Sequence, residues 1–400
     1  MHSQYAQIMA GLYIHIPFCK SRCIYCNFYS TTHADMRQRY VDALCREMEI
    51  RSSLPDSPLE KEIETIYLGG GTPSQLTIPQ LKQLFLYINK VYPHSSLHTR
   101  EVTIEMNPDD VTAPYAKALS QLGINRVSMG AQTFDNERLH FLHRRHTSEQ
   151  VAEAVSRLRA VGIQNISIDL MYGFPNETIE DWQRDIDAAL ALNVEHISAY
   201  CLMIEEGTPL WKWKKVNGEW AMDEELERQM YELLIDKLTA AGYEHYEISN
   251  FAKPGYRSRH NSSYWHDIPY IGLGAAAHSY MPVDSDDSLP AASTAGSTSR
   301  SWNVADIRQY IETIEQGERP CEEEIIDEDT HYNDRITTAL RTSDGLDLTT
   351  LSDNHRRYCL REAQRYINDG LLKLADNRLS LTRKGLFVSD YVMSSLIMVD

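Results

Sequence analysis

The chain has 400 residues and a formal net charge of −18, which disfavours a general nucleic-acid surface because phosphate recognition needs a basic face. The hydrophobic share of 42% allows a sizeable core, and the length suggests one large domain plus a smaller one. No apolar run reaches about 18 residues, so no integral membrane span is expected. The first residues lack the pattern of a secretion signal, and seven cysteines without a paired framework favour a cytoplasmic location.

Three cysteines, Cys19, Cys23 and Cys26, are spaced Cys-x3-Cys-x2-Cys directly after the apolar, β-like run 12–16. Three thiolates this close in sequence can hold three irons of a cubane cluster. The fourth iron would then lack a thiolate from this segment and could take a small-molecule ligand. Thiolates are soft ligands, so the pattern favours an iron–sulfur cluster or zinc over magnesium or calcium.

A zinc knuckle is the alternative for the same three cysteines. A structural zinc site needs four ligands, and the sequence has no second Cys-x2-Cys pair. His15 or His33 could complete a tetrahedron, so spacing alone leaves both kinds of metal site open.

Strand-like and helix-like segments alternate along the first half of the chain. The predicted strands after 12–16 are 64–68, 102–106, 126–129, 165–170 and 196–202. The predicted helices cover 35–51 and 147–161, and others begin after Thr77, Thr112 and Thr178. Six such units predict an α/β fold with a parallel sheet, curled by right-handed crossovers into a whole or partial barrel. Chemistry in such barrels gathers at the carboxyl ends of the strands.

The second half of the chain is more varied. Residues 211–242 read as helical and 243–251 as a short strand, while 282–300 are predicted to be a mobile loop before a helix at 306–317. Helices at 330–341 and 355–369, followed by a hairpin at 371–382, resemble a winged-helix module whose local acidity disfavours DNA binding. The expected division is a barrel over 1–245, a connecting segment over 246–320 and a small helical, winged-helix-like domain over 321–400.

The cysteine motif resembles the signature of the radical S-adenosylmethionine (SAM) superfamily, in which an aromatic residue such as Tyr25 often precedes the last cysteine. The flanking run 13–19 resembles the anaerobic coproporphyrinogen III oxidase family. That branch contains oxygen-independent coproporphyrinogen III dehydrogenases and HemW-type haem chaperones. The resemblance implies a six-unit partial TIM-like barrel, with a [4Fe-4S] cluster on Cys19, Cys23 and Cys26 and S-adenosylmethionine on the open iron.

The resemblance also implies a set of residues around S-adenosylmethionine, most of them at expected strand ends. They are Tyr13, Tyr25, Gly70, Gly71, Thr72, Glu105, Gln132, Arg144 and Asp169. Without the family resemblance, each of these residues has an ordinary structural interpretation. The glycine run is a tight turn without the Lys-Ser/Thr of a phosphate loop, and a carboxylate at a strand end is usually solvated or paired.

Two features distinguish the two branches. The dehydrogenase carries a further cysteine two residues after the third cluster cysteine, where this chain has Phe28, and its N-terminal extension is missing before Cys19. The run His260-Asn261-Ser262-Ser263-Tyr264-Trp265, expected in a polar loop, resembles a motif of the haem chaperones. Imidazole can ligate haem iron and aromatic rings offer flat apolar faces, so His260, Asn261, Tyr264 and Trp265 are the candidate haem-binding residues.

The resemblance therefore implies a haem chaperone that binds haem, a [4Fe-4S] cluster and S-adenosylmethionine and passes haem to acceptor proteins. The alternative is oxygen-independent coproporphyrinogen III dehydrogenase, and a third possibility is a radical enzyme with another substrate. Coproporphyrinogen dehydrogenase activity is not expected, and no residue is assigned a catalytic role. An electron donor is an expected partner if S-adenosylmethionine is cleaved.

Overall fold

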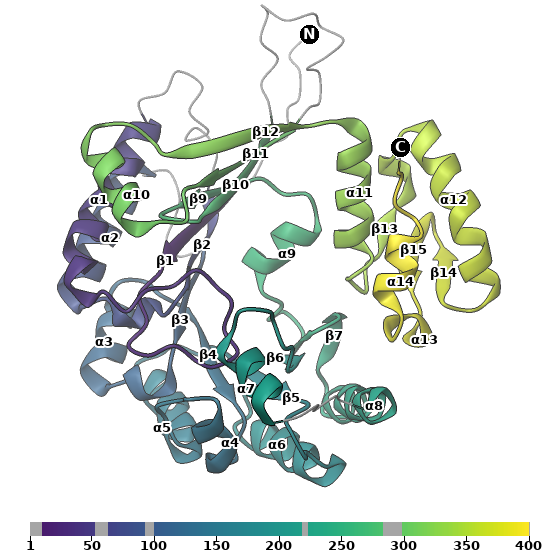
Figure 1. Ribbon diagram of the computed structural model, residues 1–400, viewed down its shortest axis with the longest axis horizontal. Helices are drawn as coiled ribbons and strands as arrows, with labels where there is room; N and C mark the ends of the chain where they lie inside the picture. The colour runs from purple at the N-terminus through teal and green to yellow at the C-terminus, as the bar shows by residue number, and fades with distance from the viewer. Residues whose placement is uncertain (1–9, 53–62, 93–99, 218–222, 283–297, 400) are drawn as a thin grey trace, which may run out of the picture.

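A twelve-stranded sheet organises most of the molecule (Figure 1). The computed structural model describes residues 10–52, 63–92, 100–217, 223–282 and 298–399. The strand order is β12-β11-β10-β9-β1-β2-β3-β4-β5-β6-β8-β7, and β1 to β6 are parallel neighbours. The predicted α/β fold with six parallel βα units is confirmed.

The elements of the large sheet have the following bounds. Its strands are β1 (Ala10–Ile16), β2 (Ile63–Gly70), β3 (Glu101–Met106), β4 (Arg126–Gln132), β5 (Asn165–Tyr172), β6 (His196–Cys201), β7 (Glu244–Glu247), β8 (Asn250–Ala252), β9 (Tyr270–Leu273), β10 (His278–Pro282), β11 (Thr298–Asn303) and β12 (Cys321–Ile326). The helices between them are α1 (Arg37–Ser52), α2 (Ile78–Val91), α3 (Ala113–Gln121), α4 (Asn136–Phe141), α5 (Ser148–Ala160), α6 (Ile179–Ala191), α7 (Pro209–Asn217), α8 (Glu224–Ala240), α9 (Arg259–Trp265) and α10 (Ile307–Glu315).

Alternation along β1 separates the core from the site. Leu12, Ile14 and Ile16 are fully buried in the main hydrophobic cluster, together with residues of α1 and α2. Because successive side chains of a strand point to opposite faces, Tyr13 and His15 project to the other side of the sheet. That side carries the polar and aromatic groups described below.

Helix starts follow the predicted caps. The Thr77 side chain accepts a hydrogen bond from Gln80 N, and the Gln80 side chain accepts one from Thr77 N, so the predicted capping box is present. The Thr178 box at the start of α6 has the same reciprocal pattern with Asp181. Such caps satisfy backbone N–H groups that have no partner within the helix.

The later strands extend the same sheet at both ends. Strand β9 pairs in parallel with β1, and β10, β11 and β12 follow in antiparallel order. At the other end β8 pairs antiparallel with β6. Within the described ranges, residues 250–326 therefore share the sheet of residues 10–201, as Figure 1 shows.

The predicted mobile loop over 282–300 is wrong at its ends. Pro282 pairs with Thr298 at the start of a five-pair antiparallel ladder between β10 and β11. The polar, low-complexity composition of this segment gave no sign of a strand. Strands pair through backbone hydrogen bonds, which do not require alternating apolar side chains. Residues 283–297 lie outside the described residues.

The C-terminal region has its own hydrophobic core, with Tyr332, Ile336 and Cys359 among its buried members. Its elements are α11 (Glu328–Ala339), β13 (Leu346–Asp347), α12 (Asp353–Asn368), β14 (Leu372–Ala375), β15 (Arg378–Leu381), α13 (Arg383–Leu386) and α14 (Ser389–Ser394). The predicted two helices and hairpin are confirmed, and β13 adds a third strand to the hairpin. Nowhere in the described ranges is a helix both long and apolar enough to cross a membrane.

Candidate functional site

The three clustered cysteines lie on the segment between β1 and α1, at the carboxyl end of β1. Backbone hydrogen bonds fix both ends of this cluster loop (residues 17–33): Cys19 N donates to Thr31 O at 2.9 Å, and Thr31 N donates to Pro17 O at 2.7 Å. Its centre is tied to neighbouring loops, since Ile24 N donates to Leu142 O and Leu210 N donates to Ile24 O. All three thiols are free and half-buried. The loop is therefore anchored while its sulfurs stay accessible.

The thiols have different neighbours. Cys19 Sγ lies 3.6 Å from Thr72 Oγ1, and Arg144 Nη1 donates to Cys23 Sγ at 3.5 Å. Burial raises the pKa of the Cys19 and Cys26 thiols, and each is raised further by a nearby cluster cysteine. Since iron binds thiolates, a cluster bound here would have to displace these protons.

The same geometry bears on the zinc alternative. Across the described ranges, no three His, Cys, Asp or Glu side chains are grouped so that they could hold one metal ion. Zinc needs ligands that converge on one ion, whereas the three thiolates of a cubane each bind a different iron. His15 is engaged at both ring nitrogens, by Tyr13 Oη at 3.0 Å and Tyr29 O at 3.1 Å, and His33 is exposed. The donor set thus fits a cluster better than a knuckle.

The glycine run after β2 brings a backbone turn against the cluster loop. Gly70 has φ of +110°, and a Cβ added there would lie 2.5 Å from the His15 ring. A Cβ added at Gly71 would lie 2.7 Å from the Pro17 carbonyl carbon and 3.1 Å from Cys19 Sγ. Only glycine allows this approach, so the turn leaves its backbone groups beside a cluster thiol.

Two carboxylates lie toward the carboxyl ends of strands of the large sheet, Glu105 on β3 and Asp169 on β5. Glu105 accepts hydrogen bonds from Tyr67 Oη at 2.7 Å and Gly70 N at 3.2 Å. Burial, with a smaller contribution from nearby Asp169, raises the pKa of Glu105 to about 7 against the lowering effect of the Tyr67 hydrogen bond. Burial likewise raises the pKa of Asp169 to about 6, and Ser128 Oγ donates to its Oδ1 at 3.4 Å. Burial therefore disfavours the ionised form of both carboxyl groups, and a cation such as an aminium bound beside them would favour ionisation.

Gln132 and Arg144 meet over Gly130. A Cβ at Gly130 would lie 2.6 Å from Gln132 Nε2 and 3.0 Å from Arg144 Nη2. Arg144 also donates to Asn107 Oδ1 at 2.7 Å, while its buried Nε has no protein partner. Burial raises the pKa of Tyr25, which lies close enough to Cys23 and Arg144 for their charges to influence it. An unpartnered guanidinium N–H beside a cluster thiol is available to a carboxylate ligand.

The predicted haem motif is not in a loop. Residues 259–265 form helix α9, capped by Ser258, and His260 is only 1% exposed. Its Nδ1 lies 2.8 Å from Thr65 Oγ1 and its Nε2 lies 2.9 Å from Tyr264 Oη. Burial lowers the pKa of His260 to about 3. The expectation of a loop was wrong, because the polar residues of the motif form a capped helix whose histidine side chain is buried.

The remaining motif residues point to different surroundings. Asn261 N donates to the Ser258 cap at 3.3 Å. The half-buried Trp265 has the Arg341 guanidinium 5.3 Å from its ring centroid, and its Nε1 is buried without a protein partner. It borders a cavity of about 380 Å³ together with α11 and α14. The motif therefore faces the barrel interior with His260 and the C-terminal region with Trp265.

Two residues of the site were not predicted: Tyr67 binds Glu105, and Asn107 binds Arg144. His15 was considered only as a zinc ligand, and its ring instead lies against Gly70. Tyr67 and Gly69 share one face of β2, and Asn107-Pro108 ends β3, so alternation and strand ends were the available signals.

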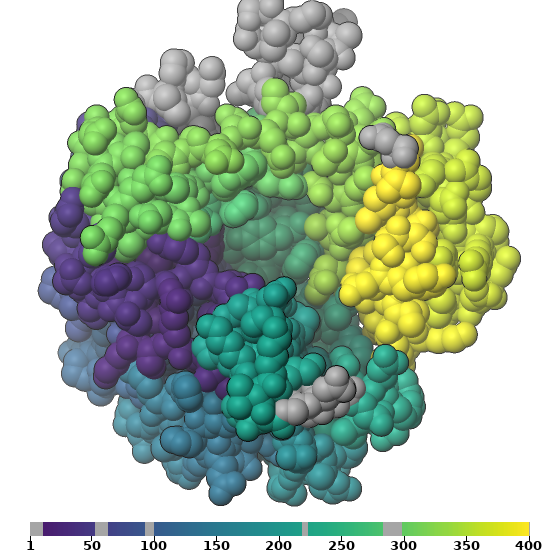
Figure 2. Space-filling model, in the orientation of Figure 1, coloured from purple at the N-terminus to yellow at the C-terminus, as the bar shows by residue number. Residues whose placement is uncertain are grey.

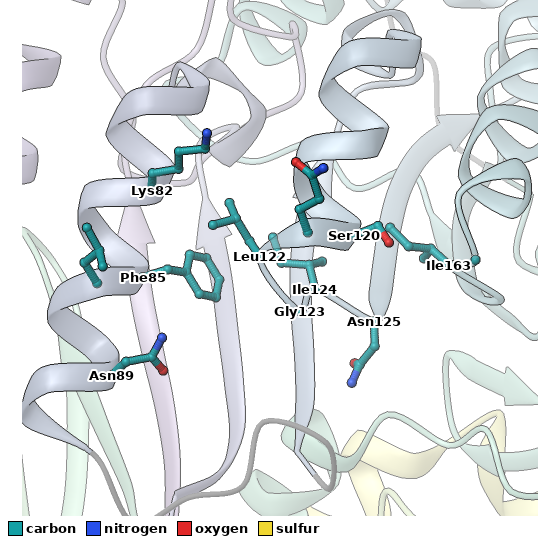
Figure 3. A pocket seen from close by; sticks show the side chains of 12 residues that line it. Lys82, Phe85, Asn89, Ser120, Leu122, Gly123, Ile124, Asn125 and Ile163 are labelled. Carbon is teal, nitrogen blue, oxygen red and sulfur yellow. The ribbon is translucent and has the colours of Figure 1, made fainter.

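Two depressions lie at different places. In Figure 2 the surface is hollowed at its centre, between the purple cluster-loop region, the teal segment around α7 and the light-green β11–β12 region. A separate groove of about 730 Å³ lies between α2 and the turns that precede β4 and β5, lined by Phe85, Leu122 and Ile163 among others (Figure 3). It is bordered by none of the predicted site residues.

Known proteins match both parts of the chain. The radical SAM superfamily matches residues 13–189, and the HemN C-terminal domain matches residues 326–388. The heme chaperone HemW of Bacillus subtilis is 33% identical over 97% of this chain and 99% of its own. HemW of Mycobacterium tuberculosis H37Rv is 33% identical over 97% and 94%, and HemW of Escherichia coli K12 is 34% identical over 67% and 69%.

A solved structure supports the fold. The coproporphyrinogen III oxidase HemN of Escherichia coli superposes with a TM-score of 0.79 at 20% identity, covering 99% of this chain and 92% of that one. At this identity the likeness describes the fold alone. Relatives that match nearly from end to end at 33% identity are decisive for the family, and the chain belongs to the HemW family of radical SAM proteins.

Proposed function

We propose that this protein is a haem chaperone that binds haem together with a [4Fe-4S] cluster and S-adenosylmethionine, and that it transfers haem to acceptor proteins. The observation that carries the proposal is the 33% identity to a heme chaperone over 97% of this chain and 99% of the relative. A match of this extent includes the cluster loop, the glycine turn, α9 and the C-terminal region.

The donor set supports the cluster and its ligand. Cys19, Cys23 and Cys26 would hold three irons, and the bound cluster supplies one-electron chemistry to S-adenosylmethionine. Among the protein groups, Arg144 donates a hydrogen bond to Cys23 Sγ, and its free Nε–H is available to the ligand carboxylate.

The other pocket groups would hold the remainder of S-adenosylmethionine. Gly70 and Gly71 let the ligand approach the backbone, and ionised Glu105 and Asp169 attract its aminium and sulfonium charges. Four more of the predicted residues lie in the same region. Tyr13 lies beside His15 and Thr72 beside Cys19. Tyr25 lies near Cys23, and Gln132 lies over Gly130.

Coproporphyrinogen dehydrogenase is the second candidate, because the fold shared with HemN over 99% of the chain is compatible with either function. One local feature opposes it. Phe28, at the position of the dehydrogenase's additional cysteine, is 76% exposed on the cluster loop, and phenyl cannot replace a thiol in metal binding or redox chemistry. We therefore propose that the protein does not decarboxylate coproporphyrinogen.

The two functions are separated by parallel assays on anaerobically reconstituted protein. Haem titration should give a saturable Soret band, and an apo-haem protein added afterwards should gain haem faster than it does from the same concentration of free haem. Coproporphyrinogen with S-adenosylmethionine and a one-electron donor should give no protoporphyrinogen. Turnover on the scale of seconds to minutes would identify the dehydrogenase instead.

Acceptor proteins are the partners that this function requires, and an electron donor is a further partner if S-adenosylmethionine is cleaved. The net charge of −18 favours basic patches on such partners and makes encounter rates dependent on salt. Nucleic acid is not among them on the same electrostatic ground.

A further inference from the structure

Helix α9 lies between the candidate S-adenosylmethionine pocket and the C-terminal region. In Figure 1 it stands at the centre of the molecule, between the strands of the large sheet and α11. Its two backbone N–H groups at Arg259 and His260 donate to the Glu101 carboxylate at the start of β3, at 3.1 and 3.0 Å. These bonds anchor the helix to the opposite end of β3 from Glu105.

His260 fits into the barrel interior with little space around it. A Cβ added at Gly11 would lie 3.1 Å from the His260 ring. The ring stacks on Tyr67 with centroids 5.0 Å apart and on Tyr13 with centroids 6.4 Å apart. Thr65 and Tyr264 engage the two ring nitrogens, so the ring is fixed in position and in orientation.

The stacked tyrosine continues to the pocket. Tyr67 Oη donates to Glu105 Oε1, and Glu105 Oε2 accepts from Gly70 N in the glycine turn. A Cβ added at Gly69 would lie 2.8 Å from the Tyr67 ring and 3.1 Å from Glu105 Oε1, so these groups are closely packed. A change in the Tyr67 ring position would therefore be transmitted to the carboxylate.

The other end of α9 contacts the C-terminal region. The Trp265 ring lies under the Arg341 guanidinium, and Arg341 Nη2 forms an ion pair with buried Glu247 at 3.0 Å. The Arg341 carbonyl also accepts from Ile248 N at 3.1 Å. Helix α9 is thus fixed between two parts of the molecule that carry separate hydrophobic cores.

We infer that His260 is a positioning residue for the S-adenosylmethionine pocket, acting through Tyr67 on Glu105, and that α9 links this pocket to the C-terminal region. The inference rests on the proposed role of Glu105 in binding S-adenosylmethionine. It departs from the expectation that His260 ligates haem iron. An axial ligand would have to give up the contact on its ligating nitrogen, Tyr264 at Nε2 or Thr65 at Nδ1, while a positioning residue keeps both contacts.

The test compares His260→Ala with Tyr67→Phe and with a matched control. Tyr67→Phe keeps the ring and removes only the hydrogen bond to Glu105. The control is His196→Ala, because His196 is also 1% exposed and has Ser167 Oγ and Tyr246 Oη at 2.8 Å from its two ring nitrogens. It differs in that Tyr246, not Tyr67, is its ring neighbour.

Three measurements are made on each reconstituted holoprotein: S-adenosylmethionine affinity by calorimetry, the change in the reduced-cluster EPR spectrum on adding S-adenosylmethionine, and the Soret band on haem titration. His260→Ala and Tyr67→Phe should each lower S-adenosylmethionine affinity about tenfold, which is the effect of one lost charged hydrogen bond. Because both act on Glu105, the loss of affinity in the double variant should not exceed the sum of the two single losses. The Soret band should stay at the wild-type wavelength in all of them.

Unchanged S-adenosylmethionine affinity and EPR response in His260→Ala would overturn the inference, and so would an equal loss in His196→Ala. A Soret shift in His260→Ala alone would make His260 a haem ligand instead. Failure of the proposed function has a different signature, because there the wild-type protein itself would show no saturable haem binding.

Discussion

The cluster loop and helix α9 are both short, motif-bearing segments, but their functional side chains are presented in opposite ways. The three thiols of the cluster loop are free and half-buried, and one of them accepts a hydrogen bond from an arginine with spare N–H capacity. In α9 the His260 ring is 1% exposed and both its nitrogens are engaged by protein groups. A motif prepared for an added ligand leaves donors and acceptors open, whereas one used for positioning saturates them.

The comparison predicts different consequences of mutation in the two segments. Changes in the cluster loop should cost cofactor and leave the fold, because few core contacts are lost. Changes around His260 should cost stability or pocket geometry and leave the iron content, because the lost contacts are internal.

The largest effect is expected from replacing Cys19, Cys23 and Cys26 by Ala together. The variant should lose nearly all iron and labile sulfide after anaerobic reconstitution, since no other cysteine follows this spacing. Iron and sulfide analysis, with Cys45→Ala as the control, measures this. Cys45 is 3% exposed in the main core and should keep full iron. Zinc without sulfide in the wild-type protein would instead support a knuckle.

Removing a hydroxyl beside His260 should cost stability and no iron. Thr65→Val keeps the side-chain shape but leaves the buried Nδ1 of His260 without its partner, which costs about 1–3 kcal/mol in the free energy of unfolding. Denaturant titration measures the change, and iron analysis should match the wild type. Ser167→Ala, which does the same to His196, is the matched variant. A loss of iron in Thr65→Val would end the contrast between the two segments.

The pH dependence of ligand binding should report on Glu105. Its pKa is raised to about 7, so in the ligand-free protein the carboxyl is protonated below that pH and cannot attract an aminium. S-Adenosylmethionine affinity should therefore rise as the pH increases from 6 to about 8, the range over which a single group with this pKa titrates. Glu105→Gln should remove this pH dependence.

The same carboxyl has a linked effect on stability. A raised acid pKa means that the folded state binds more protons than the unfolded one between pH 4.5 and about 7, so the free energy of unfolding falls as the pH rises through that range. Melting curves of the ligand-free wild type and of Glu105→Gln should differ by this slope, because the other titrating groups contribute equally to both proteins. Identical slopes in the two proteins would place the titrating group elsewhere.

Arg144→Gln should shift the reduction potential of the cluster to more negative values. The guanidinium beside Cys23 Sγ favours the added electron, and both net charge and hydrogen bonds to sulfur set cluster potentials. The matched control is Arg145→Gln, because Arg145 is paired with Asp109 at 2.8 Å and Asp110 at 3.0 Å. Redox titration followed by EPR should separate the two variants, and equal potentials would contradict the Arg144 assignment.

The smallest effect is expected at Phe28. Its side chain is 76% exposed, so Phe28→Cys should leave iron content, potential and melting temperature close to those of the wild type. It should also not create coproporphyrinogen turnover, because one thiol does not supply the substrate site. Protoporphyrinogen formation by this variant, detected by fluorescence after oxidation, would show that position 28 alone separates the two functions.

The sequence by itself determined the features that depend on local spacing. The cysteine pattern, the six βα units and the caps at Thr77 and Thr178 were predicted, and the fold and the caps are confirmed, because hydrophobic periodicity and side chain-to-backbone bonds act within a few residues. Strand-end position also placed Glu105 and Asp169 on the side where chemistry gathers.

Only the tertiary structure decided which of these groups are open to a ligand. The His260 ring contacts Thr65 and Tyr67, which lie about two hundred residues earlier in the chain, and no local sequence pattern predicts that contact. The pairing of Pro282 with Thr298 was missed for the same reason, since its partner strand has a composition typical of a loop. The burial of a polar motif depends on what packs against it, and that is settled only when the barrel and helix α9 come together.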